Sequence, residues 1–488
     1  MMNKLRSTIW LFVVLLACCL TNPEPVDGPV AFTHITVIDA TGSPPQTDMT
    51  VVVSAGRITA LGKVTDTSVP QSARVVDASG KFVIPGLWDM HVHTLQSMSS
   101  GGKSFDVYEA FFPLFVANGV TGVRDMNGDL DLLARVRQKV SGGEILGPQV
   151  VAAGPIVDGV SWPFGSIAVS SVDDGQHAVR LVKERGANFV KVGSLVPRDA
   201  YFSIVAEAKS QKISFVGHVP FAVTAREASD AGQRSIEHLD GVLLASSPRE
   251  SPLREEMQNA MKTGDFSVLW RSRVRAEAKA LETYDEGLAA ELTSRFIKNG
   301  TWQVPTLVLK RATSFLQDKR FTDDRRLVYI PSYLLATWGA DNGLTGKYDA
   351  QDFENDKTVF RKLLQVVGMM HHAGVKFMPG TDTIDPYIFP GFSVHDELAL
   401  FVQAGLTPME ALQTATRNPA EYLGITESAG SVAVGKVADL VLLDANPLEE
   451  IRNTQRIWAV VLHGKLLQKA ALEALLVSRR AAAKQGGA

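Results

Sequence analysis

Most of the chain alternates between short apolar runs and longer segments with apolar residues at helical spacing. Short apolar runs predict buried strands, and apolar residues three and four positions apart predict helices that cover a sheet. Repeated alternation of the two is typical of parallel βα units. The expected helices are 109–118, 129–140, 175–185, 199–211 and 359–373.

Eight strand segments follow one another through the middle of the chain. Eight parallel strands close into a barrel whose interior is filled by side chains. We therefore expect an α/β fold with a (β/α)8 TIM barrel over residues 84–424. The segments are 82–93, 120–126, 149–157, 189–192, 214–219, 235–239, 302–308 and 376–382.

Both ends of the globular chain show a different sequence pattern, in which short β-type runs are separated by turn residues. These runs are 31–38, 50–53 and 57–61 near the start, with a Gly- and Pro-containing turn at 41–45, and 437–443 and 457–462 near the end. Pieces at opposite ends of a chain pair when the termini lie close together. We expect a small β-sandwich domain built from 29–83 and 425–470.

Two further segments depart from the βα pattern. The stretch within 245–300 is rich in charged and helix-forming residues and predicts a helical insertion. Such an insertion either covers the barrel mouth as a lid or is a surface addition, and the sequence leaves both alternatives open. The last ten residues, 479–488, are expected to be a disordered tail.

The first residues resemble a secretory signal peptide, which we place at 1–21. Lys4 and Arg6 precede an apolar run over 9–20 that is too short to span a membrane. Leu15-Leu16-Ala17-Cys18 is similar to a bacterial lipobox, so cleavage with a lipid anchor on Cys18 and ordinary signal cleavage are both open, as is a buried N-terminal helix. We expect an exported protein of a bacterium, either periplasmic or a lipoprotein anchored to the envelope.

Composition excludes several classes of protein. The chain has 488 residues, 45% hydrophobic and 21% charged, with a formal net charge of −3, and it lacks the basic face that nucleic-acid binding requires. Its two cysteines, Cys18 and Cys19, both lie in the leader. The globular part therefore has no thiolate to serve as nucleophile or metal ligand.

Polar residues stand at the C-terminal ends of five predicted strands, which is where barrel enzymes place their chemistry. His91 and His93 end the first strand, and alternation points both to the same side, where two imidazoles can reach one metal ion at about 2.0–2.1 Å. Four later strands also end in potential metal ligands. They are Lys191, His218, His238 and Asp382.

These positions together resemble the ligand set of the binuclear amidohydrolase superfamily, and in particular its imidazolonepropionase-like and Xaa-Pro (Xaa-Arg) dipeptidase branch. Further matches run over nearly the whole globular chain. They are Gly119-Val120-Thr121-Gly122-Val123-Arg124-Asp125, Ile236-Glu237-His238, Gly380-Thr381-Asp382-Thr383, Thr407-Pro408-Met409-Glu410-Ala411-Leu412 and Gly435-Lys436-Val437-Ala438-Asp439-Leu440.

The resemblance implies two divalent metal ions, zinc by analogy. His91, His93 and Asp382 would bind one ion, His218 and His238 the other, and a carboxylated Lys191 would bridge them. An ammonium beside two dications is repelled, whereas a carbamate carries a negative charge and supplies two oxygens. In the alternative, Lys191 pairs with an acidic neighbour and only one ion binds.

The implied reaction is hydrolysis of a C–N amide bond in a dipeptide or N-acyl amino acid. A bridging hydroxide, whose pKa two metal ions bring towards about 7, would attack, and Asp382 would act as general base and then general acid. No Gly-x-Ser-x-Gly motif suggests a serine nucleophile. The expected partner is a small amide or dipeptide, and a homo-oligomer is expected.

Three other activities remain open. One is a mononuclear cyclic-amide hydrolase or deaminase of the imidazolonepropionase type, although Lys191 is present and His218-Val219-Pro220-Phe221 offers no glutamate. Another is phosphotriester or lactone hydrolysis. A different class altogether is a catalytically silent barrel that acts as a binding module.

Three residues are candidate substrate contacts. Arg124 would hold a carboxylate or else pair with an acid, Trp162 would shape the pocket, and His395 would contact substrate or cap a helix. Glu237 is expected to alternate to the opposite face from His238 and to lie under a helix. The chain lacks the Gly-Gly-His motif that related dipeptidases often carry, which leaves their substrate preference open.

Overall fold

The computed structural model describes residues 28–100, 103–162, 165–339 and 344–485. The predicted signal peptide and Cys18 lie outside the described residues. None of the described helices is both long and apolar enough to span a membrane.

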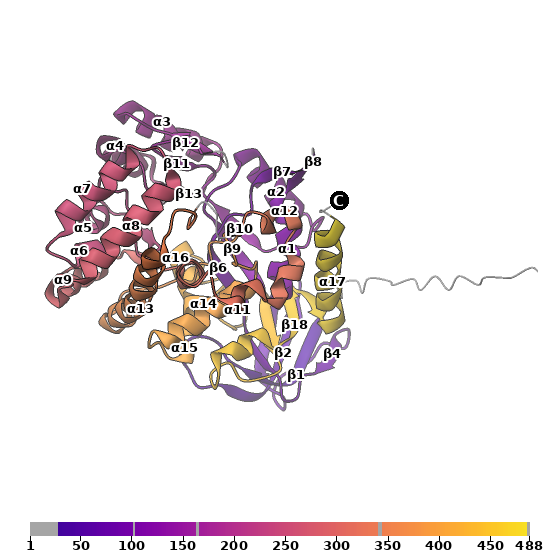
Figure 1. Cartoon of the computed structure of the whole chain (residues 1–488). Helices are drawn as coiled ribbons and strands as arrows, with labels where there is room; N and C mark the ends of the chain where they lie inside the picture. Colours follow the sequence, from indigo (N-terminus) through magenta and orange to yellow (C-terminus); the bar gives the residue numbers. More distant parts are fainter. Residues whose placement is uncertain (1–27, 101–102, 163–164, 340–343, 486–488) are drawn as a thin grey trace, which may run out of the picture.

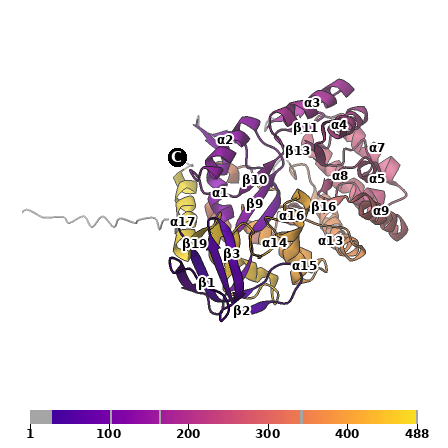
Figure 2. The ribbon, with the colours of Figure 1, turned by 180° about the vertical axis from the view of Figure 1, so that it is seen from behind.

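Strands from both ends of the chain form one mixed, eight-stranded sheet in the order β19-β18-β17-β5-β1-β2-β3, with β4 paired to β1. Figure 1 shows indigo N-terminal strands beside yellow C-terminal ones, and Figure 2 shows the same from behind. The predicted pairing of the two ends is confirmed, and its description as a sandwich stays a prediction. The strands are β1 (Val30–Val37), β2 (Gln46–Ser54), β3 (Arg57–Lys63), β4 (Arg74–Asp77), β5 (Phe82–Pro85), β17 (Leu440–Leu443), β18 (Ile457–Leu462) and β19 (Lys465–Gln468).

The middle of the chain forms parallel sheets in the orders β10-β9-β6 and β12-β11-β13-β14-β15-β16. Two parallel bridges, Val92 with Thr383 and Gln303 with Phe377, place the segment 377–383 between β6 and β16. This arrangement is consistent with the expected barrel. The strands are β6 (Leu87–Val92), β9 (Val120–Asp125), β10 (Gln149–Ala152), β11 (Ile156–Asp158), β12 (Ser166–Ala168), β13 (Phe189–Val192), β14 (Ser214–Gly217), β15 (Ser235–Glu237) and β16 (Trp302–Val304), and β7 (Ser97–Ser100) and β8 (Lys103–Asp106) form a separate hairpin.

Helices follow most of these strands, close to the predicted positions. Local sequence starts several of them: Thr224 and Glu227 form a capping box on α5, and Thr407 and Glu410 form another on α15. The helices are α1 (Val107–Ala117), α2 (Leu130–Ser141), α3 (Val172–Glu184), α4 (Arg198–Gln211), α5 (Ala225–Asp230), α10 (Leu307–Ser314), α11 (Lys319–Thr322), α12 (Ser332–Leu335), α13 (Ala350–Ala373), α14 (Phe392–Gln403), α15 (Pro408–Thr414), α16 (Arg417–Leu423) and α17 (Lys469–Gln485), with 3-10 turns η1 (Arg325–Tyr329) and η2 (Ile451–Gln455).

The predicted insertion, residues 245–300, is helical and contains three helices, which extend to one side of the molecule in Figure 1. They are α7 (Glu250–Met261), α8 (Phe266–Leu281) and α9 (Glu286–Asn299), and the short helix α6 (Val242–Ala245) precedes them. Helix α8 packs against α6, α7 and α13. It therefore links the insertion to the helical layer of the main fold.

The predicted disordered tail is wrong over 479–485, because α17 continues through Gln485. The helix packs on α1, β18 and β19, and Arg479 donates to the Glu109 carbonyl at 3.0 Å. The sequence suggested disorder because the last residues are small and polar. Contacts with α1 outweigh that weak local preference.

Two separate apolar cores support the site. Aromatic and thioether side chains from the parallel strands pack among themselves beneath the strand ends, and the mixed sheet has its own core. Since packed interiors resist deformation, the residues at the strand ends are held in fixed positions. The first core contains Trp88, Met90, Met126, Phe189, Val216, Trp302, Val304 and Met378.

Candidate metal centre

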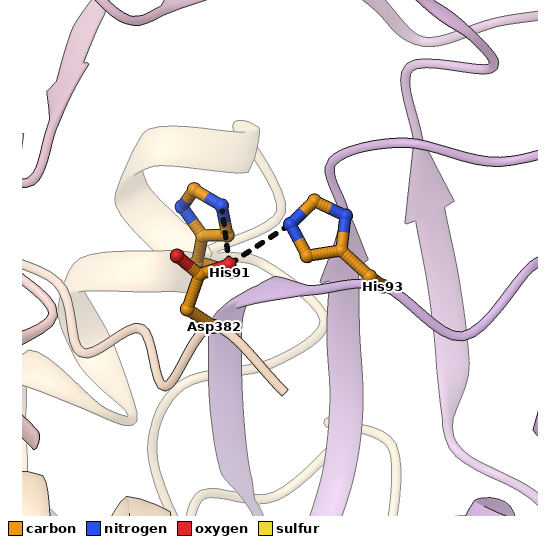
Figure 3. Close-up of side chains that lie close together, drawn as sticks. All are labelled: His91, His93 and Asp382. Carbon is orange, nitrogen blue, oxygen red and sulfur yellow. Dashed lines mark ion pairs between the residues drawn. The ribbon is translucent and has the colours of Figure 1, made fainter. Parts of the chain in front are cut away.

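His91, His93 and Asp382 converge at the end of β6 (Figure 3). The Asp382 Oδ1 atom lies 3.2 Å from His91 Nε2 and 2.9 Å from His93 Nε2, and the three ligand atoms lie within 4.8 Å of one another. Ligand atoms about 2.0–2.1 Å from one tetrahedral zinc ion lie about 3.3 Å apart. The spacing therefore fits a shared ion.

His218 and His238 lie beside this group. Their rings stack with centroids 4.9 Å apart, and the His91 and His238 centroids are 4.8 Å apart. His238 Nε2 is 3.7 Å from Asp382 Oδ2, so the two carboxylate oxygens of Asp382 face different histidines. The structure thus brings together the four histidines and the aspartate predicted from the strand ends.

Backbone conformation at two strand ends places these side chains. His238 and Asp382 have φ values of 58° and 63°, in the left-handed region that non-glycine residues seldom adopt. The Asp382 amide also donates to the His91 carbonyl at 2.8 Å, which ties its loop to β6. Strained backbone held by surrounding contacts is common at functional sites.

The prediction for Glu237 is wrong. Its side chain is fully buried and accepts at Oε2 from His91 Nδ1 at 2.9 Å, directly behind the metal group. Strand alternation would put Glu237 and His238 on opposite faces, but the left-handed backbone at His238 breaks that alternation. Both side chains therefore face the site.

Three of the four histidines have their Nδ1 atoms engaged on the side away from the cluster. His91 Nδ1 contacts Glu237, His218 Nδ1 lies 2.7 Å from Asp240 Oδ2, and His238 Nδ1 lies 2.6 Å from Thr306 Oγ1. A proton on Nδ1 leaves the Nε2 lone pair free for a metal ion. This second ring of contacts is what a histidine ligand requires.

The two carboxylates in that ring stay ionised. Burial raises the pKa of Glu237, but the charge of Arg124 and the contacts with His91 outweigh burial and bring the pKa below its ordinary value. Burial also raises the pKa of Asp240, but the charge of Arg273 outweighs burial and brings the pKa below its ordinary value. Arg273 Nη2 lies 2.5 Å from Asp240 Oδ1. Each carboxylate can therefore accept a histidine proton.

Lys191 has its side chain buried at the centre of the strands, with 1% of the residue exposed. Its Nζ atom has no hydrogen-bond partner among the described residues, and burial lowers the pKa of the amine. Gly217 provides the space, since a Cβ there would lie 2.8 Å from Lys191 Cδ and 2.4 Å from the Val192 carbonyl. Burying a charged amine without a hydrogen-bond partner costs free energy of folding. A carbamate on that nitrogen would be an anion able to bind metal ions at this site.

A buried network holds the loop that carries Asp382. Thr381 donates through its amide and its hydroxyl to Asp89, at 3.0 and 2.6 Å. Burial raises the pKa of Asp89 to about 7. The sequence contained a signal for Asp89, because alternation from His91 places it on the same inner side of β6.

Two of the three candidate substrate contacts, Arg124 and His395, are buried, and Arg124 takes its alternative role of pairing with an acid. Arg124 is fully buried, and its Nη2 donates to both Glu237 oxygens at 2.8 and 2.9 Å, beneath the histidines. His395 is buried within α14, with Nδ1 2.9 Å from Thr454 Oγ1 and Nε2 3.1 Å from the Asn118 carbonyl. Neither side chain is accessible to a substrate.

Trp162 lies where the sequence indicated, at the mouth of the site. Its indole nitrogen donates to Asp158 Oδ2 at 2.8 Å, and its ring meets Phe266 of α8 edge to face at 5.0 Å. Trp162 and His218 line the same pocket. Its role towards substrate stays a prediction.

A profile of the amidohydrolase family matches residues 334–467, and this segment supplies Asp382 of the converging group. Over this part of its length the chain is similar to the amidohydrolase family. The chain also shares 45% identity over 60 residues with adenine deaminase 2 of Jannaschia sp. (strain CCS1), a match that spans only 12% of the chain and 9% of that relative.

Solved structures extend the likeness to the whole fold. A Xaa-Pro dipeptidase with bound methionine is 19% identical, with a TM-score of 0.63 over 90% of this chain and 100% of the other. Bottromycin amidohydrolase is 23% identical, with a TM-score of 0.69 over 93% and 90%. A prolidase complexed with N-methylphosphonate-L-proline is 21% identical, with a TM-score of 0.63 over 90% and 99%. At these identities the likeness concerns the fold.

Proposed function

We propose that the protein hydrolyses the C–N amide bond of a dipeptide or N-acyl amino acid at a binuclear metal site, at the mouth of a closed (β/α)8 barrel. One observation carries the proposal: His91, His93 and His238 present Nε2 atoms to the two oxygens of Asp382. Their Nδ1 atoms face away, and two of them contact buried polar groups. Packing of an apolar core does not require such an arrangement.

The residues fit two divalent ions, with zinc the expected metal for a set of imidazoles and carboxylates. His91, His93 and Asp382 would hold one ion, His218 and His238 the other, and carboxylated Lys191 both. When bound, the ions would activate water and polarise the amide carbonyl. The buried, unpartnered Nζ of Lys191 supports the carbamate, since carboxylation converts an isolated cation into an anionic ligand.

Asp382 is the residue that would move protons. Burial raises the pKa of its carboxyl, but the adjacent His91 and His238 outweigh burial and keep the pKa well below its ordinary value. An ionised Asp382 can accept a proton from the attacking water and return it to the leaving amine. No covalent intermediate with the enzyme is needed in this reaction.

The test of the reaction is turnover of dipeptide and N-acyl amino acid libraries by the metal-loaded enzyme, before and after chelation. We expect cleavage of a subset of amides, lost on chelation and restored by zinc. Absence of metal-dependent cleavage throughout both libraries would rule out the proposed substrate class. Paraoxon-type phosphotriesters and lactones in the same assay would detect ester chemistry instead.

The test of the metal site is the metal content per chain with and without bicarbonate. For the wild type we expect two ions per chain when bicarbonate is present. Lys191→Met removes the amine while preserving apolar bulk, so its metal content should fall and no longer respond to bicarbonate. A wild-type ratio of two that ignores bicarbonate would contradict the carbamate.

A mononuclear deaminase or cyclic-amide hydrolase is the second candidate. The observation that favours it is the compactness of His91, His93 and Asp382, which form a complete three-residue group without Lys191. The local match to an adenine deaminase agrees with this alternative. One ion per chain, with ammonia released from an aminopurine or a cyclic amide opened, would establish it.

We also propose export of the protein, to the periplasm or, through a lipid on Cys18, to the bacterial envelope, and assembly as a homo-oligomer. The charged start and apolar run of residues 1–20 support export. Mass analysis of the mature N-terminus would distinguish a lipidated Cys18 from ordinary cleavage. Light scattering would give the oligomeric state.

A further inference from the structure

Helix α8 of the insertion forms a wall of a small pocket beside the candidate metal centre. The pocket has a volume of about 100 Å³ and includes His218, one of the proposed metal ligands. Aromatic and aliphatic side chains make up most of its lining. The residues are Ile156, Asp158, Trp162, Ser194, Leu195, His218, Phe221, Phe266, Leu269, Trp270 and Arg273.

The wall that α8 provides is fixed in place. Asp265 caps the first turn by accepting from the Ser267 and Val268 amides at 2.9 and 3.3 Å. Further along, Arg273 pairs with Asp240 at 2.5 Å, and Arg275 pairs with Asp352 at the start of α13 at 2.6 Å. The pocket is thus preformed, as small-molecule sites usually are.

The charged groups on the lining already have partners. Asp158 accepts from Trp162 Nε1 and from the Gly159 and Leu195 amides at 2.7 to 2.8 Å. Arg273 is paired with Asp240 and also with Glu277, at 3.0 Å. A charged ligand group would have to break these pairs, whereas an apolar group would not. The pocket therefore favours an apolar occupant.

Volume limits the size of that occupant. A pocket of about 100 Å³ accepts a branched aliphatic group or a single aromatic ring, on the scale of cavities that bind benzene. Trp162 and Phe266, which meet edge to face, present aromatic surface to it. Since His218 is part of the lining, the occupant lies next to the bond that would be cleaved.

We propose that this pocket binds the side chain of a Leu-, Met- or Phe-like residue adjoining the scissile amide. The substrate class is then N-acyl amino acids or dipeptides with an apolar residue at that position. The proposal rests on the proposed function and adds a specificity determinant to it. Phe266, Leu269 and Trp270 of α8 supply the selectivity.

The test uses amino acid hydroxamates as inhibitors of the metal-loaded enzyme, because they share one metal-binding group and differ only in side chain. For the wild type we expect the leucine and phenylalanine hydroxamates to bind at least about 10-fold more tightly than the glycine one, because a single methylene in an apolar pocket is already worth about 10–200-fold. Phe266→Ala and Trp270→Ala should each reduce that preference at least 10-fold. Binding of each hydroxamate is followed by calorimetry.

Lys279→Ala is the matched control on the same helix. Lys279 pairs with Glu256 at 2.5 Å and lies outside the pocket. The Lys279→Ala variant should therefore show the same preference among the hydroxamates as the wild type. If Trp270→Ala does not fold, Phe266→Leu trims the half-buried end of the pocket with less disruption and should weaken phenylalanine hydroxamate binding selectively. Metal content of every variant is measured alongside.

Hydroxamate affinities that do not depend on side chain in the wild type would overturn the proposal. So would a preference that survives both Phe266→Ala and Trp270→Ala. If hydroxamates discriminate as expected but no amide in the libraries is cleaved, the pocket assignment stands and amide hydrolysis fails. The two proposals are therefore tested separately.

Discussion

Glu237 contacts two residues whose roles depend on it. Its carboxylate accepts from His91 Nδ1 and, at both oxygens, from Arg124 Nη2, and both Arg124 and Glu237 are fully buried. Arg124 also donates to the Met90 carbonyl at 2.6 Å. Removing one partner of such a buried ion pair is strongly destabilising, because the other charge then stays buried without a counter-charge.

We expect Arg124→Met to cost about 3–5 kcal/mol in the free energy of unfolding, because it leaves the Glu237 carboxylate buried without its counter-charge. The double variant Arg124→Met with Glu237→Gln should recover most of that loss. Urea denaturation of chelator-treated protein measures both values. Equal destabilisation of the single and double variants would show that lost packing, and not the isolated charge, causes the effect.

His395 predicts a pH dependence of stability. Burial lowers its pKa to about 4, against an ordinary value of about 6.5, so the folded protein binds fewer protons than the unfolded chain between these values. Stability from this group is therefore full above pH 6.5 and is lost as the pH falls towards 4. The shift corresponds to about 3 kcal/mol.

The measurement is the urea midpoint of wild type and His395→Gln between pH 4.5 and 7.5, with both proteins free of metal. Gln keeps the capacity to donate and accept but does not titrate in this range. The variant should be less stable at pH 7.5 and should lose less stability on acidification. Parallel pH profiles would mean that other groups cause the acid sensitivity.

The residues that sequence reasoning found and those it missed differ in a physical way. His91, His93 and Asp382 were predictable because ligands at strand ends follow from strand register alone. Glu237 was misplaced because the left-handed backbone of His238 is a property of the folded loop. For Arg124 the sequence left pairing with an acid open but did not identify Glu237, because that partner lies 113 positions away in the sequence.

Helix α8 connects the insertion to a metal ligand. Arg273 lies on α8 and pairs with Asp240, and Asp240 contacts His218 Nδ1. The same Arg273 also pairs with Glu277, which lies 3.3 Å from Lys310 of α10. The sequence left open whether this insertion was a surface addition, and these contacts place part of it directly behind the candidate site.

We expect Arg273→Met to lower metal affinity about 10–100-fold, the usual effect of removing a group that orients a histidine ligand. The reason is that Asp240 would lose the cation that keeps its pKa low and its position fixed. Competition with a fluorescent zinc chelator measures the affinity. Lys279→Met, which removes an exposed cation from the same helix, is the control and should bind zinc like the wild type.

Over the whole molecule, local patterns predicted the order of strands and helices, whereas long-range contacts determine where some elements end. The C-terminal helix α17 is an example. Residues 479–485 have little apolar character, yet they continue α17, whose Leu472 joins a core cluster with Val116, Val460, Leu462 and Leu467. No local pattern in the sequence indicates that α1 and the mixed sheet offer this helix a surface to pack on.

Removal of residues 469–488 should therefore destabilise the protein without emptying the metal site. Exposure of the surface beneath α17 is expected to cost about 2–5 kcal/mol, from the loss of one or two buried leucines. The urea midpoint and the metal content per chain check this. A truncation after Gln485 is the control and should match the full chain, and loss of metal on removing α17 would contradict the separation of the Leu472 cluster from the core beneath the metal site.

The pairing of β5 with both β1 and β17 makes the order of synthesis matter. While the ribosome works from Pro85 to Leu440, which takes on the order of tens of seconds at about 5–20 residues per second, β5 has no neighbour on that side. During this interval one backbone edge is exposed and able to pair wrongly. A nascent chain of this protein therefore carries an unpaired strand edge until about its last fifty residues appear.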